Sequence, residues 1–274
     1  MKTERHHRSP LGREVIHSRR YNPGHLYPVS RLEGRRETGL DKALPFQGSD
    51  VWNAYEISWL NTRGRPEIAI GRFVFPCDTA NLIESKSLKL YLNSLNQEHY
   101  DTTDRVRETI AKDLSAAAGG EAIVTLTPAG QFKTMAIGTP PGKCIDDLDI
   151  EVHGYRLDPE VLGTAAEPVE ETVFSNLLRT NCPVTGQPDW GTVVIRYKGK
   201  RIDPEGLLKY IVSYRQHTGF HENCVERIFA DISERCTPEQ LFVQAHFTRR
   251  GGLDINPWRA NYAAAPNLPR YPRQ

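Results

Sequence analysis

The feature that most constrains the fold of this 274-residue chain is an internal repeat. Short β-rich runs alternate with longer helical patterns, and the same order occurs twice along the sequence. The first copy has predicted helices at 84–95 and 103–118 and predicted strands at 52–60, 67–75, 121–126 and 145–152. The second has predicted helices at 204–215 and 222–236 and predicted strands at 172–178, 192–197, 241–248 and toward Trp258. The sequence therefore predicts a duplicated ββααββ unit.

The register of the side chains supports a true duplication. The apolar face of the helix predicted at 84–95 is formed by Leu88, Tyr91, Leu92 and Leu95. Adding 119 to each number gives Leu207, Tyr210, Ile211 and Tyr214. The polar residues Ser94 and Gln97 likewise become Ser213 and Gln216. Two amphipathic helices can match by chance on their apolar faces, but shared polar residues and a shared element order argue against chance. We expect one module at 1–160 and another at 161–274, with 158–170 as the linker.

The beginning of the chain and its overall charge limit the possible partners. Residues 1–45 are polar and contain several prolines, so we expect an extended arm rather than a packed element. The chain has 35 basic against 34 acidic residues, and a net charge of +1 provides no chain-wide attraction for nucleic acid or acidic lipids. We expect no secretory signal, transit peptide or membrane-spanning run. A small-molecule partner is therefore predicted.

The cysteines indicate a reducing compartment. They are odd in number, widely spaced and form no CxxC pair: Cys77, Cys144, Cys182, Cys224 and Cys236. Neither a disulfide framework nor a zinc ribbon is indicated by this spacing. We expect reduced thiols in the cytoplasm.

The two halves differ most where a functional site is expected. Glu84-Ser85-Lys86-Ser87 opens the first helix of the first half, whereas its counterpart Asp203–Gly206 is an ordinary helix start. A cysteine-containing loop at 181–190 and the pair His221-Glu222 occur only in the second half. Because each half keeps what the other lacks, one site with residues from both halves is expected.

Cys182 lies in a turn-rich segment with Pro183, Gly186 and Pro188, where a rigid loop can present an exposed thiol. A nucleophilic role is chemically possible there. The alternative is a small buried hydrophobic residue, as free cysteines commonly are. Asp189, seven residues further on, could return beside the thiol and exchange protons with it or with a substrate. Alternatively, it begins a turn or strand.

His221 and Glu222 begin an apolar-periodic helix. A glutamate in a first helical turn interacts favourably with the helix dipole, which is a purely structural explanation. A carboxylate can also accept two N–H groups at once, which suits the amide-like edge of a guanine ring. A zinc site is a third alternative, since His217 and His221 are four residues apart and Cys224 is close in sequence.

Arg249-Arg250-Gly251-Gly252 joins two guanidinium groups to a glycine turn that an anion can approach closely. With Lys86 these residues could hold cofactor phosphates, although paired arginines are also common at solvated strand ends. The chain has no GxGxxG, and the stretch 138–143 lacks the spacing of a P-loop. Any nucleotide would be bound without a Rossmann unit.

Taken together, these motifs resemble the NADPH-dependent 7-cyano-7-deazaguanine reductases in their long, two-module form. The resemblance covers most of 44–258, and its motifs are Glu84–Tyr91, Cys182–Asp189, Phe220–Glu222 and Arg249–Asp254. It implies an α+β tandem tunnelling fold with two ββααββ modules, each with an antiparallel sheet and two helices. The fold is related to GTP cyclohydrolase I but lacks its zinc.

The resemblance also implies an oxidoreductase activity in queuosine biosynthesis, a tRNA modification route. Members reduce the nitrile of 7-cyano-7-deazaguanine to 7-aminomethyl-7-deazaguanine with two NADPH per turnover and no metal. Cys182 would form a covalent thioimide, and Asp189 would donate a proton. The substrate-binding residues would be Ile83, Glu84, Ser85, Phe220, His221 and Glu222. NADPH would contact Ser85, Lys86, Arg250 and Gly251.

A homodimer without nucleic-acid or membrane partners is also expected, because the open edges of such a sheet must be paired or covered. Two alternatives remain open. One is a non-catalytic purine-binding tunnelling-fold protein, which would keep Glu222 and lose the thiol. The other is a zinc-dependent, GTP-cyclohydrolase-like enzyme that uses His217, His221 and Cys224. The presence of Cys182 with Asp189 argues against the first, and metal analysis of the purified protein would identify the second.

Overall fold

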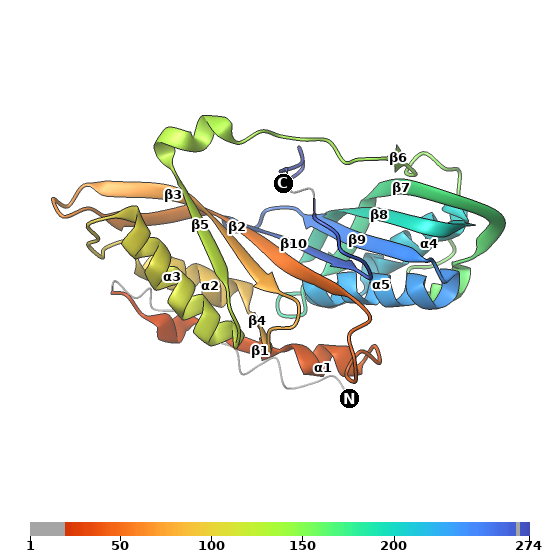
Figure 1. Ribbon diagram of the computed structural model, residues 1–274, viewed down its shortest axis with the longest axis horizontal. Coiled ribbons are helices and arrows are strands. Elements are labelled where there is room, and N and C mark those ends of the chain that lie inside the picture. Colours follow the sequence, from red (N-terminus) through yellow and green to blue (C-terminus); the bar gives the residue numbers. More distant parts are fainter. Residues whose placement is uncertain (1–19, 267–268) are drawn as a thin grey trace. The chain divides into compact units, whose positions relative to one another are not determined.

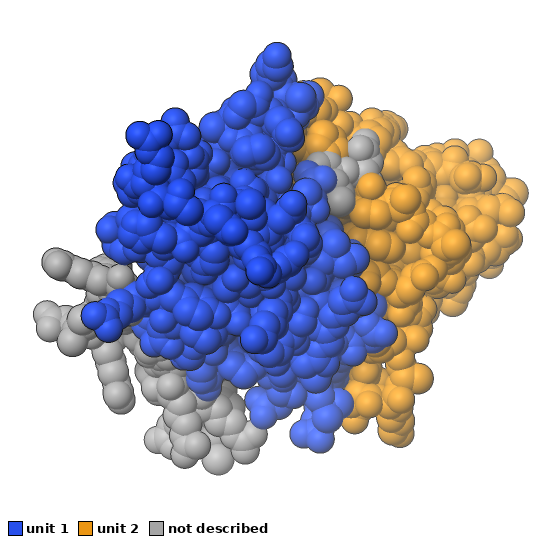
Figure 2. Space-filling model, turned by 60° about the vertical axis from the view of Figure 1, so that its left-hand side comes forward, with its two compact units in different colours: residues 1–36, 49–136, 249–255 blue, residues 37–48, 137–248, 256–274 orange. Residues whose placement is uncertain are grey.

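The computed structural model describes residues 20–266 and 269–274 of the chain. It is a mixed α+β structure in which the strands are predominantly antiparallel. The chain divides into two compact units, which Figure 2 shows in different colours. Unit 1 comprises residues 1–36, 49–136 and 249–255, and unit 2 comprises 37–48, 137–248 and 256–274. No helix within the described part of the chain is long and apolar enough to span a membrane.

In unit 1, β3 (Pro66–Pro76) pairs antiparallel with β2 (Gln47–Leu60) on one side and with β5 (Ile123–Pro128) on the other. The helices α2 (Ser85–Ser94) and α3 (Thr103–Ala118) lie along one face of these strands (Figure 1). Just before α2, β4 (Asn81–Ile83) pairs with β1 (Pro28–Ser30). The unit also contains η2 (Pro23–His25), α1 (Arg31–Arg36) and η3 (Ala129–Thr134).

Helix periodicity and caps explain the limits of α2 and α3. Apolar residues of α3 recur every four positions and are fully buried, namely Val106, Ile110, Leu114 and Ala118. The Thr102 hydroxyl accepts the N–H of Arg105 at the start of α3, and Gly119 ends the helix with a left-handed φ of 67°. The predicted limits of α3, 103–118, are confirmed.

In unit 2, β7 (Thr164–Asn181), β8 (Pro188–Ile202), β9 (Gln240–Phe247) and β10 (Leu253–Ala260) pair antiparallel in that order. The first three residues of β10 belong to unit 1. A short β6 (Lys143–Cys144) runs parallel to β7. The helices α4 (Pro204–Ser213) and α5 (His221–Cys236) lie on one face of these strands (Figure 1), with η4 (Pro159–Val161) and η5 (Tyr214–Gln216) nearby in sequence.

Each unit contains the same hydrogen-bonded link between its two helices. The Tyr91 hydroxyl on α2 donates to Asp113 on α3 at 2.6 Å, and the Tyr210 hydroxyl on α4 donates to Asp231 on α5 at 2.7 Å. Burial above all, together with the neighbouring carboxylate, raises the pKa of both tyrosine hydroxyls well above the ordinary value. Both tyrosines therefore remain protonated donors.

We expect Tyr210→Phe to lower the free energy of unfolding by about 1–3 kcal/mol, because Asp231 loses a buried hydrogen-bond donor. Urea denaturation measures this change. The control is Tyr155→Phe, since Tyr155 is 39% exposed, and we expect a change within about 0.5 kcal/mol there. Equal stability of the Tyr210→Phe variant and the wild type would show that the link contributes nothing.

A second repeated feature precedes the first helix of each unit. Asn22 caps η2 and Asp158 caps η4, in each case by accepting an N–H two residues further on. The N–H of Asn22 donates to Ser94 Oγ at 3.1 Å, and the N–H of Asp158 donates to Ser213 Oγ at 3.4 Å. The two serines are related by the offset of 119 found in the sequence. Each capped turn precedes the first predicted strand of its repeat, so the sequence pattern did not include these turns.

The predicted strand at 145–152 is wrong, because these residues form no strand and β6 ends before them, at Cys144. The segment is rich in aspartate, and the Asp146 carboxylate accepts hydrogen bonds from the Ser175 hydroxyl at 2.6 Å and from the N–H of Asn176 at 3.0 Å. Such side-chain bonds compete with a strand ladder. The linker predicted at 158–170 is also shorter than expected, since β7 begins at Thr164 and pairs with β8.

The predicted extended arm is wrong for residues 28–36, which form β1 and α1. Arg31 is 3% exposed, and its guanidinium lies 2.6 Å from the buried Asp50 carboxylate. Arg35 donates to the carbonyl of Cys77 at 2.6 Å. Both arginines have buried partners, so the segment packs instead of extending into solvent. The first 19 residues of the predicted arm lie outside the described residues.

Candidate functional site

Cys182 immediately follows β7 in the tight loop that joins β7 to β8. Its N–H donates to the Gln187 carbonyl at 2.9 Å, and its carbonyl accepts the N–H of Gly186 at 3.0 Å. Gly186 adopts a left-handed φ of 67°, which a residue with a side chain rarely adopts. These bonds make the loop a closed turn. The Cys182 side chain is half-buried at its edge.

Asp189 and His221 are brought together beside this loop. Asp189 pairs with Thr180 across the β7–β8 ladder and is 4% exposed. The Nε2 atom of His221 lies 3.4 Å from Asp189 Oδ2, within ion-pair distance when the imidazole is protonated but longer than a good hydrogen bond. The His221 ring packs against Phe247 with ring centroids 3.9 Å apart. A carboxylate and an imidazole thus share a largely buried position.

The segment before α5 is held against the end of β7. The N–H of Asn181 donates to the His217 carbonyl at 2.8 Å, and the Asn181 carbonyl accepts the N–H of Gly219 at 3.2 Å. Phe220 then occupies the N-cap of α5, and His221 and Glu222 follow in its first turn. Backbone pairing therefore determines that the Cys182 loop and the start of α5 lie together.

Glu222 is 3% exposed, although it lies in the first turn of α5. Favourable interaction with a helix dipole does not require burial. The thiol of Cys224 is fully buried, and its pKa is raised by burial first and then by the negative charges of Glu222 and Asp189. Two carboxylates therefore lie close enough to the same thiol to repel its ionised form.

The five thiols differ strongly in access to solvent. Cys77, Cys224 and Cys236 are buried, Cys144 is exposed, and Cys182 is intermediate. Burial raises the pKa of Cys236 to about 11. Of the two thiols that solvent can reach, Cys182 lies on the closed turn that joins β7 to β8, and the buried Asp189 is the second residue of β8.

The Glu-Ser-Lys-Ser motif opens α2 in unit 1. The Glu84 carboxylate caps this helix, accepting the N–H of Lys86 at 2.9 Å and that of Ser87 at 2.7 Å. Ile83 and Glu84 are buried, at 4% exposure each, whereas Ser85 and Lys86 are half-buried. The motif therefore presents Ser85 and Lys86 to solvent on the first turn of a capped helix.

The glycine turn lies against the same helix. Gly251 and Gly252 have left-handed φ values of 54° and 78°. A Cβ atom at Gly251 would lie 2.8 Å from Lys89 Nζ, which places this ammonium group beside the turn. Lys89 was not among the residues predicted for the site. Its position three residues after Lys86 on one helix was the available signal, because such residues share a face.

Asp254 connects the glycine turn to β2. Its carboxylate accepts hydrogen bonds from Asn53 at 2.7 Å and from the Tyr55 hydroxyl at 2.5 Å. The N–H of Tyr55 also donates to the Gly252 carbonyl at 2.9 Å. The turn is therefore held rigidly to β2.

The predicted residues fall into two groups. Cys182, Asp189, Phe220, His221 and Glu222 lie in unit 2, and the others lie in unit 1: Ile83, Glu84, Ser85, Lys86, Arg250 and Gly251. Within 20–266 and 269–274, the structure contains no group of three or more His, Cys, Asp or Glu side chains that could hold a metal ion.

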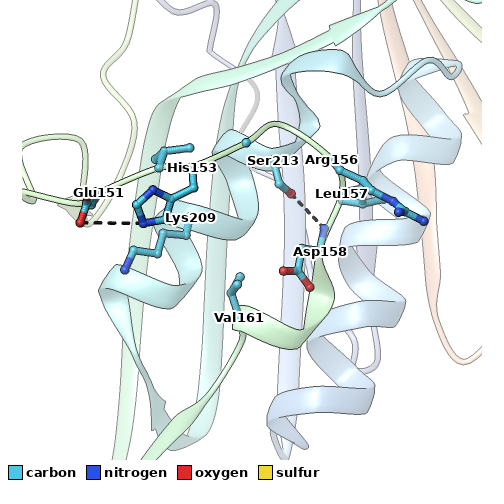
Figure 3. A pocket seen from close by; sticks show the side chains of 10 residues that line it. Glu151, His153, Arg156, Leu157, Asp158, Val161, Lys209 and Ser213 are labelled. Carbon is cyan, nitrogen blue, oxygen red and sulfur yellow. Dashed lines mark hydrogen bonds and ion pairs between the residues drawn. The ribbon is translucent and has the colours of Figure 1, made fainter.

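A groove of about 760 Å³ on unit 2 contains none of the predicted site residues (Figure 3). It is lined by residues 151–154 and 156–158 together with Val161, Lys209 and Ser213. In this groove His153 lies 3.8 Å from Glu151, and the two side chains are 80% and 83% exposed, respectively. Charges of both signs in open solvent do not indicate a particular ligand.

The structure thus defines a mixed α+β protein with a partly accessible thiol on the turn between β7 and β8, and with Asp189, the second residue of β8, in an ion pair with His221. Two family models match the chain. The first, described as nitrile reductase, 7-cyano-7-deazaguanine-reductase N-term, matches residues 17–126. The second, described as QueF-like protein, matches residues 188–266.

Full-length relatives agree with these matches. A protein of Desulfotalea psychrophila is 56% identical over 256 residues, covering 93% of both chains. A protein of Dechloromonas aromatica is 55% identical over 265 residues, covering 95% of this chain and 94% of its own. Both are named NADPH-dependent 7-cyano-7-deazaguanine reductase. The chain belongs to this reductase family.

Proposed function

We propose that this protein is an NADPH-dependent oxidoreductase that reduces the nitrile of 7-cyano-7-deazaguanine to the aminomethyl group, a step of queuosine biosynthesis. Its full-length similarity to the reductases supports the activity and the cofactor. The observation that carries the mechanism is the position of Cys182 on the closed turn between β7 and β8, because Asp189 is the second residue of β8. Reduction of a nitrile needs a nucleophile and a proton donor, and the loop provides candidates for both.

In the first step the Cys182 sulfur bonds to the nitrile carbon, one C–N π bond breaks, and the nitrogen takes a proton. The product is a covalent thioimide. Asp189 is the proposed proton donor, and His221 at 3.4 Å is placed to exchange a proton with it. A thioimide carbon carries more positive character than a nitrile carbon, so it accepts hydride more readily.

When bound, NADPH would supply two hydrides, one for the thioimide carbon and one for the imine that remains after the C–S bond breaks. The protein's own residues must exclude water, hold the intermediates and return protons to nitrogen. The low exposure of Asp189 and Glu222, 4% and 3%, supports a water-poor environment for these steps. Cys182 is released when the imine forms and is free for the next turnover.

We propose that Glu222 binds the guanine-like edge of the substrate and that Phe220 covers its ring, with contributions from His221, Ile83, Glu84 and Ser85. The buried carboxylate of Glu222 supports this role, because charge-assisted hydrogen bonds are strongest away from water. Glu84 already accepts two backbone N–H groups. We therefore propose that Glu84 contributes to substrate binding indirectly, by holding the start of α2 in place.

The chain has residues that fit the phosphates of NADPH. Lys89 and Arg250 carry positive charge at the turn 249–252, and Lys86 lies three residues before Lys89 on α2. The turn's left-handed glycines allow close approach of an anion. Ser85 on the first turn of α2 adds a hydroxyl and the positive end of a helix dipole. We propose that Ser85, Lys86, Arg250 and Gly251 hold the cofactor and that Lys89 assists them.

We expect Lys86→Ala to weaken NADPH binding by about 1.5–3 kcal/mol, because a charge-assisted hydrogen bond to phosphate is lost. Fluorescence titration of the reduced nicotinamide measures the dissociation constant, and added salt should weaken binding to the wild type more than to the variant. Lys112→Ala is the matched control, since Lys112 is exposed on α3 of the same unit. The role proposed for Lys86 would be wrong if Lys86→Ala bound NADPH as tightly as Lys112→Ala does.

We propose further that the chain is a tandem tunnelling fold with modules at 1–160 and 161–274, that it forms a homodimer, and that it works in the cytoplasm without nucleic-acid or membrane partners. The repeated Tyr–Asp links and the repeated capped turns support the duplication. Among the described residues, β5 pairs with β3 only and leaves one edge available for association. All five cysteines are free, as expected in a reducing compartment.

The test of the proposed function is to add 7-cyano-7-deazaguanine to the purified protein without NADPH. We expect a mass increase equal to one substrate molecule per chain, located by peptide mapping at Cys182. Addition of NADPH should then release the aminomethyl product with consumption of two NADPH. Absence of both adduct and product would refute the function. Stoichiometric zinc with hydrolysis of GTP would instead support the cyclohydrolase alternative.

A further inference from the structure

The segment Pro269–Gln274, which we call the tail, folds onto unit 2. Tyr271 and Gln274 are 2% and 7% exposed, whereas Arg273 is exposed. The tail is closed by two hydrogen bonds between these buried residues. The N–H of Gln274 donates to the Tyr271 carbonyl at 3.0 Å, and the N–H of Tyr271 donates to Gln274 Oε1 at 2.9 Å. The tail is therefore a formed turn with a buried side.

The buried side of the tail is bonded to β9 and β10. The Gln274 side-chain amide donates to the carbonyl of Phe247 at 3.3 Å and to Asn256 Oδ1 at 2.6 Å. The Tyr271 ring lies 4.1 Å from the His246 ring. Burial lowers the pKa of His246 to about 4, so this imidazole is neutral at physiological pH. The tail thus covers the last two residues of β9.

Phe247 contacts both the tail and one of the proposed catalytic-site residues, His221. Successive side chains of a strand point to opposite faces, so His246 faces the tail while Phe247 faces α5. The Phe247 ring packs against His221 at 3.9 Å, and His221 lies 3.4 Å from Asp189. One residue further along the chain, the N–H of Thr248 donates to the carbonyl of Trp190 at 2.8 Å, next to Asp189.

We propose that Gln274 is a positioning residue for nitrile reduction: by holding the Phe247 carbonyl, it determines where the Phe247 ring places His221 relative to Asp189. The inference rests on the proposed function. Loss of the amide leaves the end of β9 without this anchor, and a displacement of about 1 Å at reacting groups can cost as much as about 10²-fold in rate. Since Glu222 rather than His221 is proposed to bind the guanine-like edge, a shift of His221 should change substrate binding less than turnover.

The test compares Gln274→Met with Arg273→Met in the full chain. Methionine keeps the length of glutamine but has neither the amide donors nor the acceptor. We expect Gln274→Met to slow turnover about tenfold, with the dissociation constant of the nitrile base unchanged within about twofold. The matched control is Arg273→Met, which loses a tail hydrogen bond to the Asn176 carbonyl and should keep wild-type turnover. A Gln274→Met variant with wild-type turnover would overturn the inference.

Two further measurements separate positioning from general destabilisation. In a double-mutant cycle with Phe247→Leu, the second substitution should add little to the first, because both act through the same ring. Fully additive losses would contradict the inference. Independently of activity, the NMR signal of the His221 ring, assigned with His221→Asn, should shift in Gln274→Met and not in Arg273→Met. An unchanged signal would refute the positioning.

If Gln274→Met does not fold, Gln274→Glu replaces it, since glutamate keeps the acceptor for Tyr271 but lacks the donors for Phe247 and Asn256. The same outcomes then apply. If the wild-type protein shows neither adduct nor turnover, the proposed function fails, and the NMR comparison alone decides whether Gln274 positions His221.

Discussion

Cys182→Ala should abolish both the covalent adduct and turnover, with a rate loss of more than about 10⁴-fold, because no neighbouring group can replace the attacking sulfur. Binding of 7-cyano-7-deazaguanine should remain measurable, since the substitution removes only the sulfur and leaves the loop's backbone bonds in place. Intact-protein mass spectrometry and NADPH consumption report the two losses, and calorimetry reports the binding.

The control for this experiment is Cys144→Ala, because Cys144 is the exposed thiol of the chain. Its variant should form the adduct and turn over like the wild type. Cys77 and Cys236 are buried, and their Ser variants should also retain activity. A near wild-type turnover in Cys182→Ala would refute the covalent mechanism. Loss of the adduct in Cys144→Ala would mean that the nucleophile had been assigned to the wrong cysteine.

Glu222→Gln should weaken binding of the nitrile base by about 2–4 kcal/mol, which is about 30- to 1000-fold in the dissociation constant. The carboxylate can accept two N–H groups of a guanine-like edge, but the amide accepts one and turns a donor toward a donor. The effect should be large because Glu222 is only 3% exposed, so water cannot compensate. Glu222→Leu should bind more weakly still. Isothermal calorimetry with the Cys182→Ala background measures binding without chemistry.

Glu234→Gln is the matched control for this prediction, since Glu234 lies on the same helix α5 and is exposed. Its dissociation constant should equal that of the parent. Unchanged affinity in Glu222→Gln would assign recognition of the base to other residues and leave Glu222 with only a role at the helix start.

The helices were the most predictable elements, because their apolar spacing and their caps are local properties of the sequence. The limits of α3 were predicted without error, and α2 begins one residue after Glu84, which caps it. The segment 145–152 was mispredicted because the preference of Ile145 and its neighbours for a strand was weaker than the hydrogen bonds of Asp146 to distant residues. Likewise, the packing of α1 depends on Asp50, which lies 19 residues after Arg31 in sequence.

The sequence by itself indicated a repeat, the family resemblance and the candidate residues, because periodicity, turn chemistry and motif spacing are properties of consecutive positions. Only the tertiary structure decided that Cys182 remains accessible while Cys224 is buried, and that His221 lies beside Asp189. It also decided that Lys89 lies beside Gly251 and that Gln274 holds Phe247. Burial and contacts between distant residues follow from packing and strand pairing, and no local pattern in the sequence specifies them.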